Sequence, residues 1–306
     1  MRFPRVLILG AAIVVPTITA AQQPAAPAAK PITFQAVAAL TAPAPTARES
    51  YGADSSQFGE LRLPKGQAGA QRFPTIVLVH GGCWLSEYDY RYLNAMAQAL
   101  ADSGYAVWTI EFRRVGNSGG GWPNTFLDVG AATDHLRELA KRFPVDTNRV
   151  VAVGHSAGGQ LALWLPTRRR LAAGSALYTK SPLRVRGVLS IDGIADMGAY
   201  ARAKSVGCNA ATPQLMGGMP DSVPDRYVQV DPMARVPLGA RSRLLQGFLD
   251  QIVPMEQART FAARAAAAGD DSQWTLLESA GHFDAVSPRT TVFYHVLDEL
   301  RSLFDR

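Results

Sequence analysis

The sequence GHSAG at residues 154–158 constrains the fold of this 306-residue chain more than any other feature. Residues 150–153 before it are β-branched or small and predict a buried strand, and residues 159–165 after it predict a helix. Glycines on both sides of Ser156 indicate a sharp turn, because they leave room for the neighbouring strand and helix. The motif therefore predicts a serine hydroxyl projecting at the carboxyl edge of a sheet.

The rest of the chain alternates short apolar runs with helical segments. Strands are expected at residues 56–63, 75–79, 106–112, 150–153, 185–191, 244–248 and 274–277. Helices are expected at residues 90–103, 126–143, 159–165, 255–268 and 291–304. This alternation predicts an α/β protein with a doubly wound, mostly parallel sheet. Residues 196–237 interrupt it with Gly, Pro and Met and predict a small cap insertion.

The N-terminal region has the pattern of an export signal. Two arginines in residues 1–5 precede an apolar run at residues 6–15 and small residues at 19–21. Residues 1–21 are therefore predicted to be a signal peptide of a secreted or periplasmic protein, with an uncleaved anchor as the alternative. The apolar run is too short to predict stable membrane insertion.

Residues 22–49 are rich in Ala and Pro and predict a disordered tether, although residues 32–40 are more apolar than the rest. The folded domain is predicted to cover residues 50–306. The chain has 31 basic and 25 acidic residues, a net charge of +6, and no long basic run that indicates a nucleic-acid partner. It also lacks metal-ligand spacing and a phosphate-binding loop, so neither a metal nor a cofactor is predicted.

Three side chains are candidates for nucleophilic catalysis. The hydroxyl of Ser156 needs a base to take its proton, and a base of this kind needs an acid to orient it. Of the five histidines, His282 lies on a loop after the last predicted strand and is the predicted base. Asp250 follows the preceding strand and is the predicted acid. Asp192, at the end of an earlier strand, is the alternative acid.

A second glycine-rich turn is predicted to face the serine. Gly81 and Gly82 follow the strand expected at residues 75–79, and Ala157 follows the nucleophile. Their backbone N–H groups are the predicted donors to the oxyanion of a tetrahedral intermediate. The next two residues, Cys83 and Trp84, are predicted to line the substrate pocket.

These motifs together resemble the esterase/lipase branch of the α/β-hydrolases. The segments HGGCW at residues 80–84, GHSAGGQLALW from residue 154, GFLD ending at Asp250 and GHFD around His282 look closest to kynurenine-formamidase-like and small bacterial carboxylesterases. The resemblance extends roughly from residue 51 to the C-terminus. It implies the α/β-hydrolase fold, an acyl-enzyme on Ser156 and cleavage of small-molecule carboxylic esters without metal or organic cofactor.

Two other functional classes remain open from the sequence. The same resemblance allows an arylformamidase-like or aminopeptidase-like amide hydrolase. The position of Cys83 often carries an aromatic residue in formamidases, and export is unusual for them. A non-catalytic binding protein on the same fold normally has a broken triad, whereas Ser156, Asp250 and His282 are all present.

Cys83 and Cys208 are the two cysteines of the chain. Export would place them in a compartment that permits disulfides. Lids often follow the corresponding strand in the proteins that this chain resembles. We therefore hypothesise that residues 196–237 cover the active site and that Cys208 bonds Cys83, which would pin the cap to the oxyanion loop. Two free buried thiols are the alternative.

Overall fold

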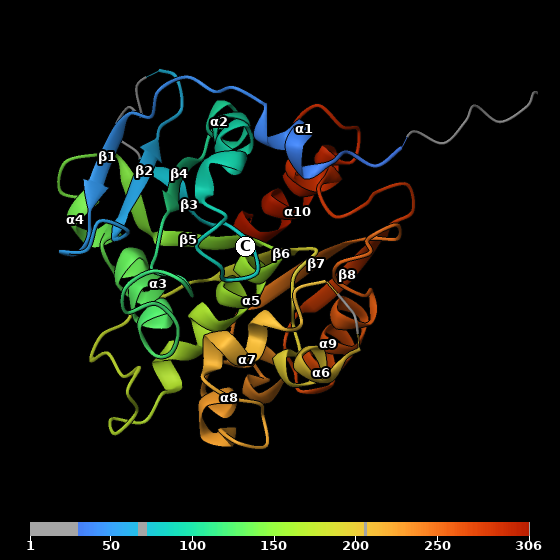
Figure 1. Cartoon of the computed structure of the whole chain (residues 1–306). Helices are drawn as coiled ribbons and strands as arrows, with labels where there is room; N and C mark the ends of the chain where they lie inside the picture. Colours follow the sequence, from blue (N-terminus) through green and yellow to red (C-terminus); the bar gives the residue numbers. More distant parts are fainter. Residues whose placement is uncertain (1–29, 67–71, 205–206, 306) are drawn as a thin grey trace, which may run out of the picture.

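A computed structural model describes residues 30–66, 72–204 and 207–305. The predicted signal peptide at residues 1–21 lies outside these ranges. At the centre is an eight-stranded sheet with the strand order β1-β2-β4-β3-β5-β6-β7-β8 (Figure 1). The strands are β1 (Ala47–Ser50), β2 (Phe58–Arg62), β3 (Phe73–Val79), β4 (Ala106–Ile110), β5 (Val145–His155), β6 (Gly187–Ile191), β7 (Arg241–Gly247) and β8 (Ser272–Leu277).

The sheet is mixed but mostly parallel. Strands β3 to β8 run parallel to one another, whereas β2, near one edge, pairs antiparallel with both β4 and the edge strand β1. The order reverses around β3, as it does in doubly wound sheets. The predicted fold class is therefore confirmed, with the edge strand β1 as an addition.

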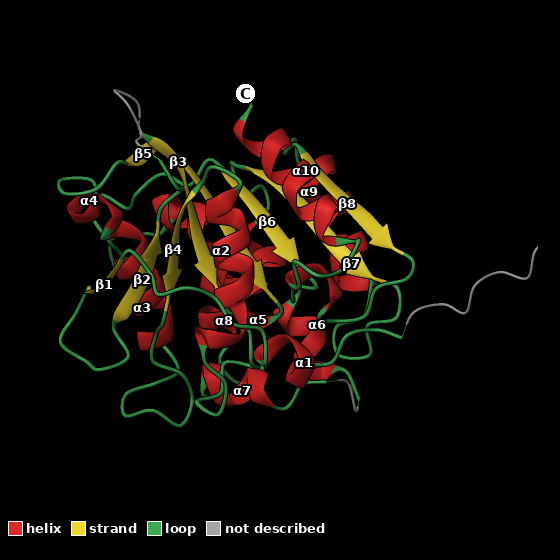
Figure 2. Ribbon diagram, turned by 90° about the horizontal axis from the view of Figure 1, so that it is seen from above, coloured by secondary structure: helices red, strands yellow, loops and turns green. Residues whose placement is uncertain are grey.

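Helices cover both faces of this sheet, as Figure 2 shows from above. The helices are α1 (Phe34–Ala38), α2 (Asn94–Asp102), α3 (Asn124–Asp134), α4 (Leu136–Leu139), α5 (Ala157–Trp164), α6 (Met197–Arg202), α7 (Ala211–Met216), α8 (Pro224–Val230), α9 (Glu256–Ala267) and α10 (Phe293–Phe304). Short 3₁₀ helices lie at Tyr90–Leu93, Leu165–Arg170, Pro232–Arg235 and Asp284–Val286. Helices α1, α2 and α10 share one core with the sheet, and α3, α5 and α9 share the other.

The strand before the serine shows why its sequence is a continuous apolar run. In β5, Val151 and Val153 belong to the core beneath α2 and α10, whereas Val150 and Ala152 belong to the opposite core. Successive side chains of a strand point to opposite faces. Since both faces are covered, every position from Val150 to Val153 has to be apolar.

The helix predicted at residues 126–143 is divided into α3 and α4. The indole Nε1 of Trp108 donates to the carbonyl oxygen of Ala132 at 2.9 Å. In a continuous helix this carbonyl would accept from the N–H of Leu136. The tryptophan takes that place, and the helix is interrupted at His135, whose ring stacks on the indole.

The structure corrects the predicted tether at residues 22–49 from residue 30 onward; residues 22–29 lie outside the described ranges. Residues 34–38 form α1, with Thr33 as its N-cap, and Ala47–Ser50 forms the edge strand β1. The side chain of Val37 is 1% exposed and belongs to the core under α2 and α10. The folded part therefore includes residues from 30 onward, and the boundary predicted at residue 50 is too late.

Residues 196–237 contain three short helices, α6 to α8, and a 3₁₀ turn. The Gly and Pro residues of the segment punctuate it: Gly217 ends α7 in the left-handed conformation, and Pro224 begins α8. Met197 and Met216 are fully buried within the protein rather than facing a substrate cavity.

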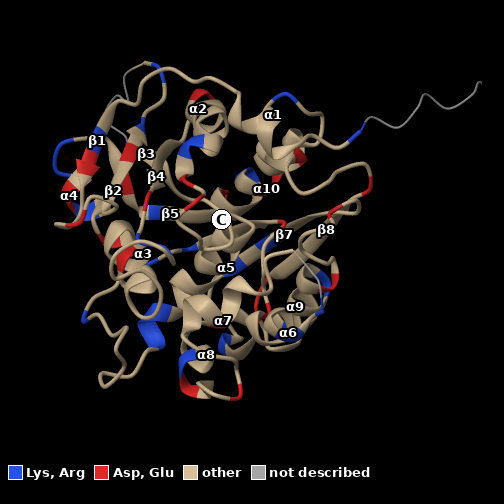
Figure 3. Ribbon diagram, in the orientation of Figure 1, with Lys and Arg blue, Asp and Glu red and all other residues tan. Residues whose placement is uncertain are grey.

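No helix in the described parts of the chain combines the length and apolarity needed to cross a bilayer. Basic and acidic residues occur together on α4 and α8 (Figure 3), which agrees with the modest net charge of +6.

Candidate active site

Ser156 occupies the turn between β5 and α5. Its φ of 56° lies in the left-handed region, which costs a non-glycine residue roughly 1–2 kcal/mol. A Cβ on Gly154 would lie 2.0 Å from the carbonyl oxygen of Gly158, and a Cβ on Gly158 would lie 2.2 Å from that of Val79. The two glycines are therefore sterically required, as the sequence predicted. Strain of this kind is often stored where a side chain has to project into a reaction site.

The loops after β7 and β8 bring Asp250 and His282 together. His282 Nδ1 lies 2.7 Å from Asp250 Oδ2. The other carboxylate oxygen accepts the N–H groups of Ile252 and Val253 at 2.7 and 3.0 Å. Burial alone would raise the pKa of Asp250, but the hydrogen bond and charge of His282 and these two N–H groups lower it overall. Asp250 is therefore an ionised acceptor that fixes the ring of His282.

Asp192, the alternative acid, has a different environment. Its Oδ1 accepts the N–H of Gly247 at 2.7 Å, and its side chain is fully buried beside Asp250. Burial and the negative charge of Asp250 raise the pKa of Asp192 well above its usual range. Asp192 therefore holds its proton more tightly than Asp250 does. Among the described contacts, the histidine ring bonds Asp250 and not Asp192.

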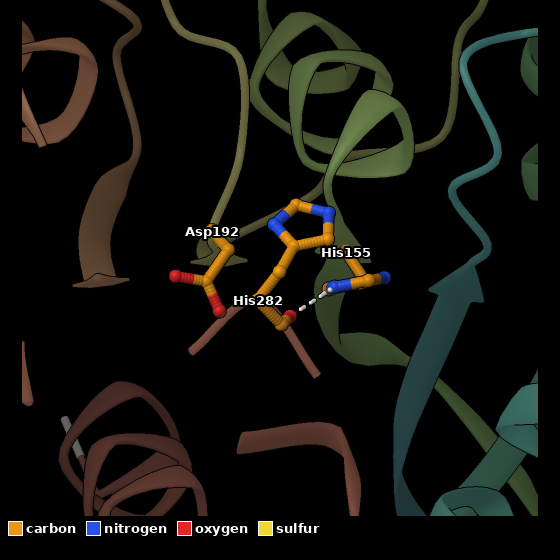
Figure 4. A group of neighbouring side chains, drawn as sticks. All are labelled: His155, Asp192 and His282. Carbon is orange, nitrogen blue, oxygen red and sulfur yellow. Dashed lines mark hydrogen bonds between the residues drawn. The ribbon is translucent and has the colours of Figure 1, made fainter. Parts of the chain in front are cut away.

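Figure 4 shows Asp192 next to His282 and His155. Ligand atoms of these three residues lie within 4.8 Å of one another, which makes them a potential metal-binding group among the described residues. Both ring nitrogens of His155 are already engaged, one by Tyr92 and the other by the carbonyl oxygen of His282. The group is therefore arranged for internal hydrogen bonding rather than for coordination.

Ser156 and His282 line the same cavity, of about 230 Å³, at the carboxyl edge of the sheet. Its walls are mostly apolar and come from six parts of the chain. They comprise Phe34, Gln35, Gly82, Cys83, Tyr88, Tyr92, His155, Ser156, Cys208, Ile252, His282 and Phe283. The cavity is smaller than the usual range for drug-sized ligands, which indicates a small bound group.

The loop after β3 is correctly predicted to face Ser156, but one predicted oxyanion donor is wrong. The N–H of Gly81 donates to the hydroxyl of Tyr92 at 2.7 Å, so it is not available to an oxyanion. Gly82 and Cys83 line the cavity, with φ values of 98° and 57°. Their N–H groups donate to no described residue. Gly82, Cys83 and Ala157 are therefore the remaining candidate donors.

His80 connects this loop to Glu111 through its ring nitrogens. Its ring is fully buried, with Nδ1 2.7 Å from the carbonyl oxygen of Gly81 and Nε2 3.0 Å from the carboxylate of Glu111. The carbonyl and the N–H of Gly81 are thus both engaged. A Cβ at this position would lie 2.9 Å from the Cβ of Ser156, so only glycine allows the loop to approach the serine this closely.

Trp84, predicted to line the substrate pocket, does not reach it. Its side chain is 1% exposed and belongs to the core that includes Trp108 and Phe126. The left-handed conformation at Cys83 and Trp84 turns the chain inward directly after the cavity. Burial of the large indole surface in the core favours this orientation.

Cys83 and Cys208 form a disulfide, with their Cα atoms 5.3 Å apart. Both residues line the cavity. The bond joins the oxyanion loop to the segment 196–237 across 125 residues of sequence. Among the described residues of that segment, Cys208 alone appears in the lining of the cavity, so this part of the predicted cap contributes an edge of the site rather than its cover.

An aromatic wall of the site was not predicted from the sequence. Phe34 lies with its ring centroid 5.6–5.7 Å from those of Tyr88, Tyr92 and Phe283. The N–H of Ile32 lies 3.2 Å from the carboxylate of Asp284, which ties this segment to the loop carrying His282. The more apolar character of residues 32–40 was the available signal, but the surrounding Ala and Pro residues obscured it.

Comparison with known proteins places these features in a family. Residues 60–264 match the model of the family described as BD-FAE, more than half of the chain. Esterase LipC of Mycobacterium tuberculosis is 27% identical over 258 residues, which is 80% of this chain and 61% of LipC. The chain therefore spans less than two thirds of that relative.

Solved structures establish the fold. Esterase B of Lactobacillus rhamnosis superposes with a TM-score of 0.71 at 20% identity, covering 88% of this chain and 89% of that one. Est2, a thermophilic esterase of Thermogutta terrifontis solved with propionate bound, gives a TM-score of 0.68 at 20% identity, covering 84% and 93%. At these identities the likeness shows the α/β-hydrolase fold alone.

Proposed function

The chain belongs to the BD-FAE family, and from that premise we propose that it is a secreted serine esterase that cleaves carboxylic esters of small acyl groups. One observation carries this proposal. Asp250 fixes His282 at 2.7 Å, and His282 lines the same cavity as the strained Ser156. This is the arrangement that nucleophilic acyl transfer requires.

The proposed reaction has two stages. The Oγ of Ser156 attacks the ester carbonyl carbon while His282 Nε2 takes the hydroxyl proton and Asp250 stabilises the resulting imidazolium. The tetrahedral oxyanion accepts hydrogen bonds from the N–H groups of Ala157, Gly82 and Cys83. Collapse expels the alcohol, which receives the proton from His282. A water molecule, deprotonated by His282, then cleaves the acyl-enzyme, and the proton returns to Ser156.

The neutral state of Asp192 supports this assignment. A second carboxylate beside Asp250 would add negative charge in a buried region and raise the cost of ionising Asp250. As a neutral acid, Asp192 can donate to the Asp250 carboxylate while its Oδ1 accepts the N–H of Gly247. Asp192 would therefore support the acid of the triad without replacing it.

The cavity supports a small acyl group. Its volume of about 230 Å³ and its mostly apolar walls suit a short aliphatic chain or a single compact ring. Est2 of Thermogutta terrifontis, which shares the fold, has been solved with propionate bound. LipC, a relative over 80% of this chain, is named an esterase.

The first experiment compares the wild type with Ser156→Ala. Substrates are p-nitrophenyl acetate, butyrate and decanoate, with formanilide and an aminoacyl anilide as amide arms. We expect hydrolysis of the short esters, loss of roughly 10³-fold or more in the variant, and labelling of the wild type alone by a fluorophosphonate. Turnover confined to an amide arm would reassign the enzyme as an amide hydrolase. A folded wild type with neither turnover nor labelling would identify a binding protein.

A matched pair of variants tests the acid. Asp250→Asn removes the charge that stabilises the imidazolium, and we expect kcat to fall on the order of 10³–10⁴-fold. Asp192→Asn replaces a neutral acid with a neutral amide that keeps one donor and one acceptor, so kcat should stay within a few-fold. The opposite ranking of the two variants would make Asp192 the catalytic acid.

Export is also part of the proposal. The arginines of residues 1–5 and the apolar run after them support a cleaved signal, and a disulfide at the active site suits an oxidising compartment. Expression of the full chain should yield an extracytoplasmic protein whose first residue is Gln22. Recovery of an intact N-terminus in the membrane fraction would favour the uncleaved anchor.

A further inference from the structure

A buried chain of hydrogen bonds connects the oxyanion loop to the catalytic histidine. The N–H of Gly81 lies 2.7 Å from the hydroxyl oxygen of Tyr92. That hydroxyl lies 2.7 Å from Nδ1 of His155, and Nε2 of His155 lies 2.8 Å from the carbonyl oxygen of His282. The side chains of Tyr92 and His155 are nearly inaccessible to solvent, at 4% and 1% exposure.

The chemistry of the two ends fixes the direction of every bond in this chain. A backbone N–H can only donate and a carbonyl oxygen can only accept. Burial lowers the pKa of His155 to about 3, with the neighbouring His282 acting in the same direction, so the ring is neutral and carries one proton. That proton must lie on Nε2, facing the carbonyl of His282. Nδ1 is then an acceptor, and the hydroxyl of Tyr92 donates to it while accepting from Gly81.

This chain of hydrogen bonds contacts each part of the site that has to be aligned. Gly81 immediately precedes the candidate oxyanion donors Gly82 and Cys83. His155 immediately precedes Ser156, and the last acceptor is the backbone of the base itself. Since the bonds point one way, a displacement at either end leaves a buried donor or acceptor unsatisfied, which is unfavourable.

We propose that Tyr92 and His155 are positioning residues, which hold the oxyanion loop, the nucleophile turn and the loop of His282 in catalytic register through this hydrogen-bonded chain. The proposal rests on the proposed esterase function. Neither residue passes a proton to substrate. Both stay neutral over the working pH range, because burial lowers the pKa of His155 and raises that of Tyr92.

The test begins with Tyr92→Phe, which removes one hydroxyl and two links of the chain. We expect kcat for the short ester to fall roughly 10- to 100-fold with KM within about two-fold, because misalignment near the reacting atoms acts on the transition state. The rate of fluorophosphonate labelling should fall in parallel. The loss should be the same at every pH, since no titrating group is removed.

Tyr90→Phe is the matched control. Tyr90 lies in the same 3₁₀ helix as Tyr92, is equally buried at 4% exposure, and donates its hydroxyl to Glu60 at 2.8 Å. Tyr90→Phe therefore removes a buried tyrosine hydrogen bond that is not part of the chain of hydrogen bonds through Tyr92 and His155. We expect a comparable loss of thermal stability with kcat unchanged. If both variants lose kcat alike, the effect is general destabilisation and the proposal fails.

A second pair of variants acts on His155. Gln carries an acceptor and a donor on one planar group, so His155→Gln can accept from Tyr92 and donate to His282. His155→Leu can do neither. We expect His155→Gln to retain at least ten-fold more kcat than His155→Leu. Equal loss in both, or a Tyr92→Phe enzyme within two-fold of the wild type, would overturn the proposal.

These outcomes are separable from failure of the proposed function. If the wild type hydrolyses no ester and reacts with no fluorophosphonate, the esterase proposal has failed before any variant is compared. If the wild type is active and Tyr92→Phe matches it, the esterase proposal stands and only the positioning role is wrong.

Discussion

Two segments that flank the cavity differ in how well their sequences predict their contribution to its wall. Residues 196–237 are an apolar, methionine-containing insertion, and residues 30–50 are part of an Ala/Pro-rich stretch. The insertion places only Cys208 in the described wall of the cavity, whereas the N-terminal stretch places Phe34 and Gln35 there. The segment that resembled a tether therefore forms more of the site than the segment that resembled a cap.

The two segments differ in where their apolar side chains pack. Met197, Tyr200 and Met216 of the insertion are buried in the main core, and the segment is fixed to α5 by bonds from Gln160 and Trp164 to its backbone. Helix α1 is too short to bury its own surface, so Phe34 packs on the aromatic rings beside the cavity. Composition over a window does not reveal such docking, because two or three large side chains are enough for it.

The largest effect should come from breaking the covalent attachment of the insertion. The disulfide closes a loop of 125 residues, so Cys83→Ala with Cys208→Ala should lower the free energy of unfolding by roughly 2–5 kcal/mol. Urea unfolding of the double variant, and of the wild type with reductant, measures this loss. Equal midpoints with and without reductant would mean that noncovalent packing alone holds the insertion.

A smaller effect concerns the acidic anchor of the insertion. Asp231 accepts the N–H groups of Met197 and Gly198, and burial raises its pKa to about 7. Because this folded value lies above the unfolded one, the contribution of Asp231 is complete below about pH 4 and is lost as pH rises through 7. The wild type should therefore lose roughly 1–3 kcal/mol relative to Asp231→Asn between pH 4 and 8. Parallel stability curves for the two proteins would refute this anchor.

The N-terminal wall should control selectivity more than stability. Phe34→Ala removes one aromatic side of the cavity, and we expect the ratio of kcat/KM for p-nitrophenyl octanoate over butyrate to rise about 5- to 10-fold. Val37→Ala is the matched control, because Val37 anchors the same helix in the core without lining the cavity. A similar rise in the control would indicate that undocking of α1, rather than the lost ring, opens the site.

The smallest effect should come from the anchor of α1. Asp284 accepts the N–H groups of Ile32 and Gly281, and Asp284→Asn weakens both charge-assisted bonds. We expect a loss of about 1 kcal/mol and faster amide exchange at Val37 and Ala39, with little change across α6. Exchange that quickens equally in both segments would erase the distinction drawn between them.

Sequence reasoning succeeded where the constraint is local. The turn at Ser156 is encoded by glycines two residues away on either side, and the strand before it by a run of apolar residues that both faces require. The division of the predicted helix at residues 126–143 shows the limit of such reasoning. This division depends on Trp108 in strand β4, whose indole N–H donates to the carbonyl oxygen of Ala132 in α3.

Within the site, the chain order of serine, acid and base favoured Asp250 without excluding Asp192, since each follows a parallel strand of the same sheet. Packing decided between them: one carboxylate bonds the histidine and two N–H groups, and the other is fully buried, which raises its pKa. Neither environment can be computed from neighbours in the sequence. The hydrogen bond from the Gly81 N–H to the hydroxyl of Tyr92 could not be predicted for the same reason.

The sequence by itself determined the parallel strands of the sheet, the nucleophile turn and the residue types at its carboxyl edge, because backbone sterics and the burial of alternate faces act over a few residues. The tertiary structure decided which N–H groups remain free, which aspartate is charged and which segment walls the cavity. Those properties depend on partners distant in the chain, such as Ile32 and Asp284 at a separation of 252 residues, and on the burial that only the complete fold creates.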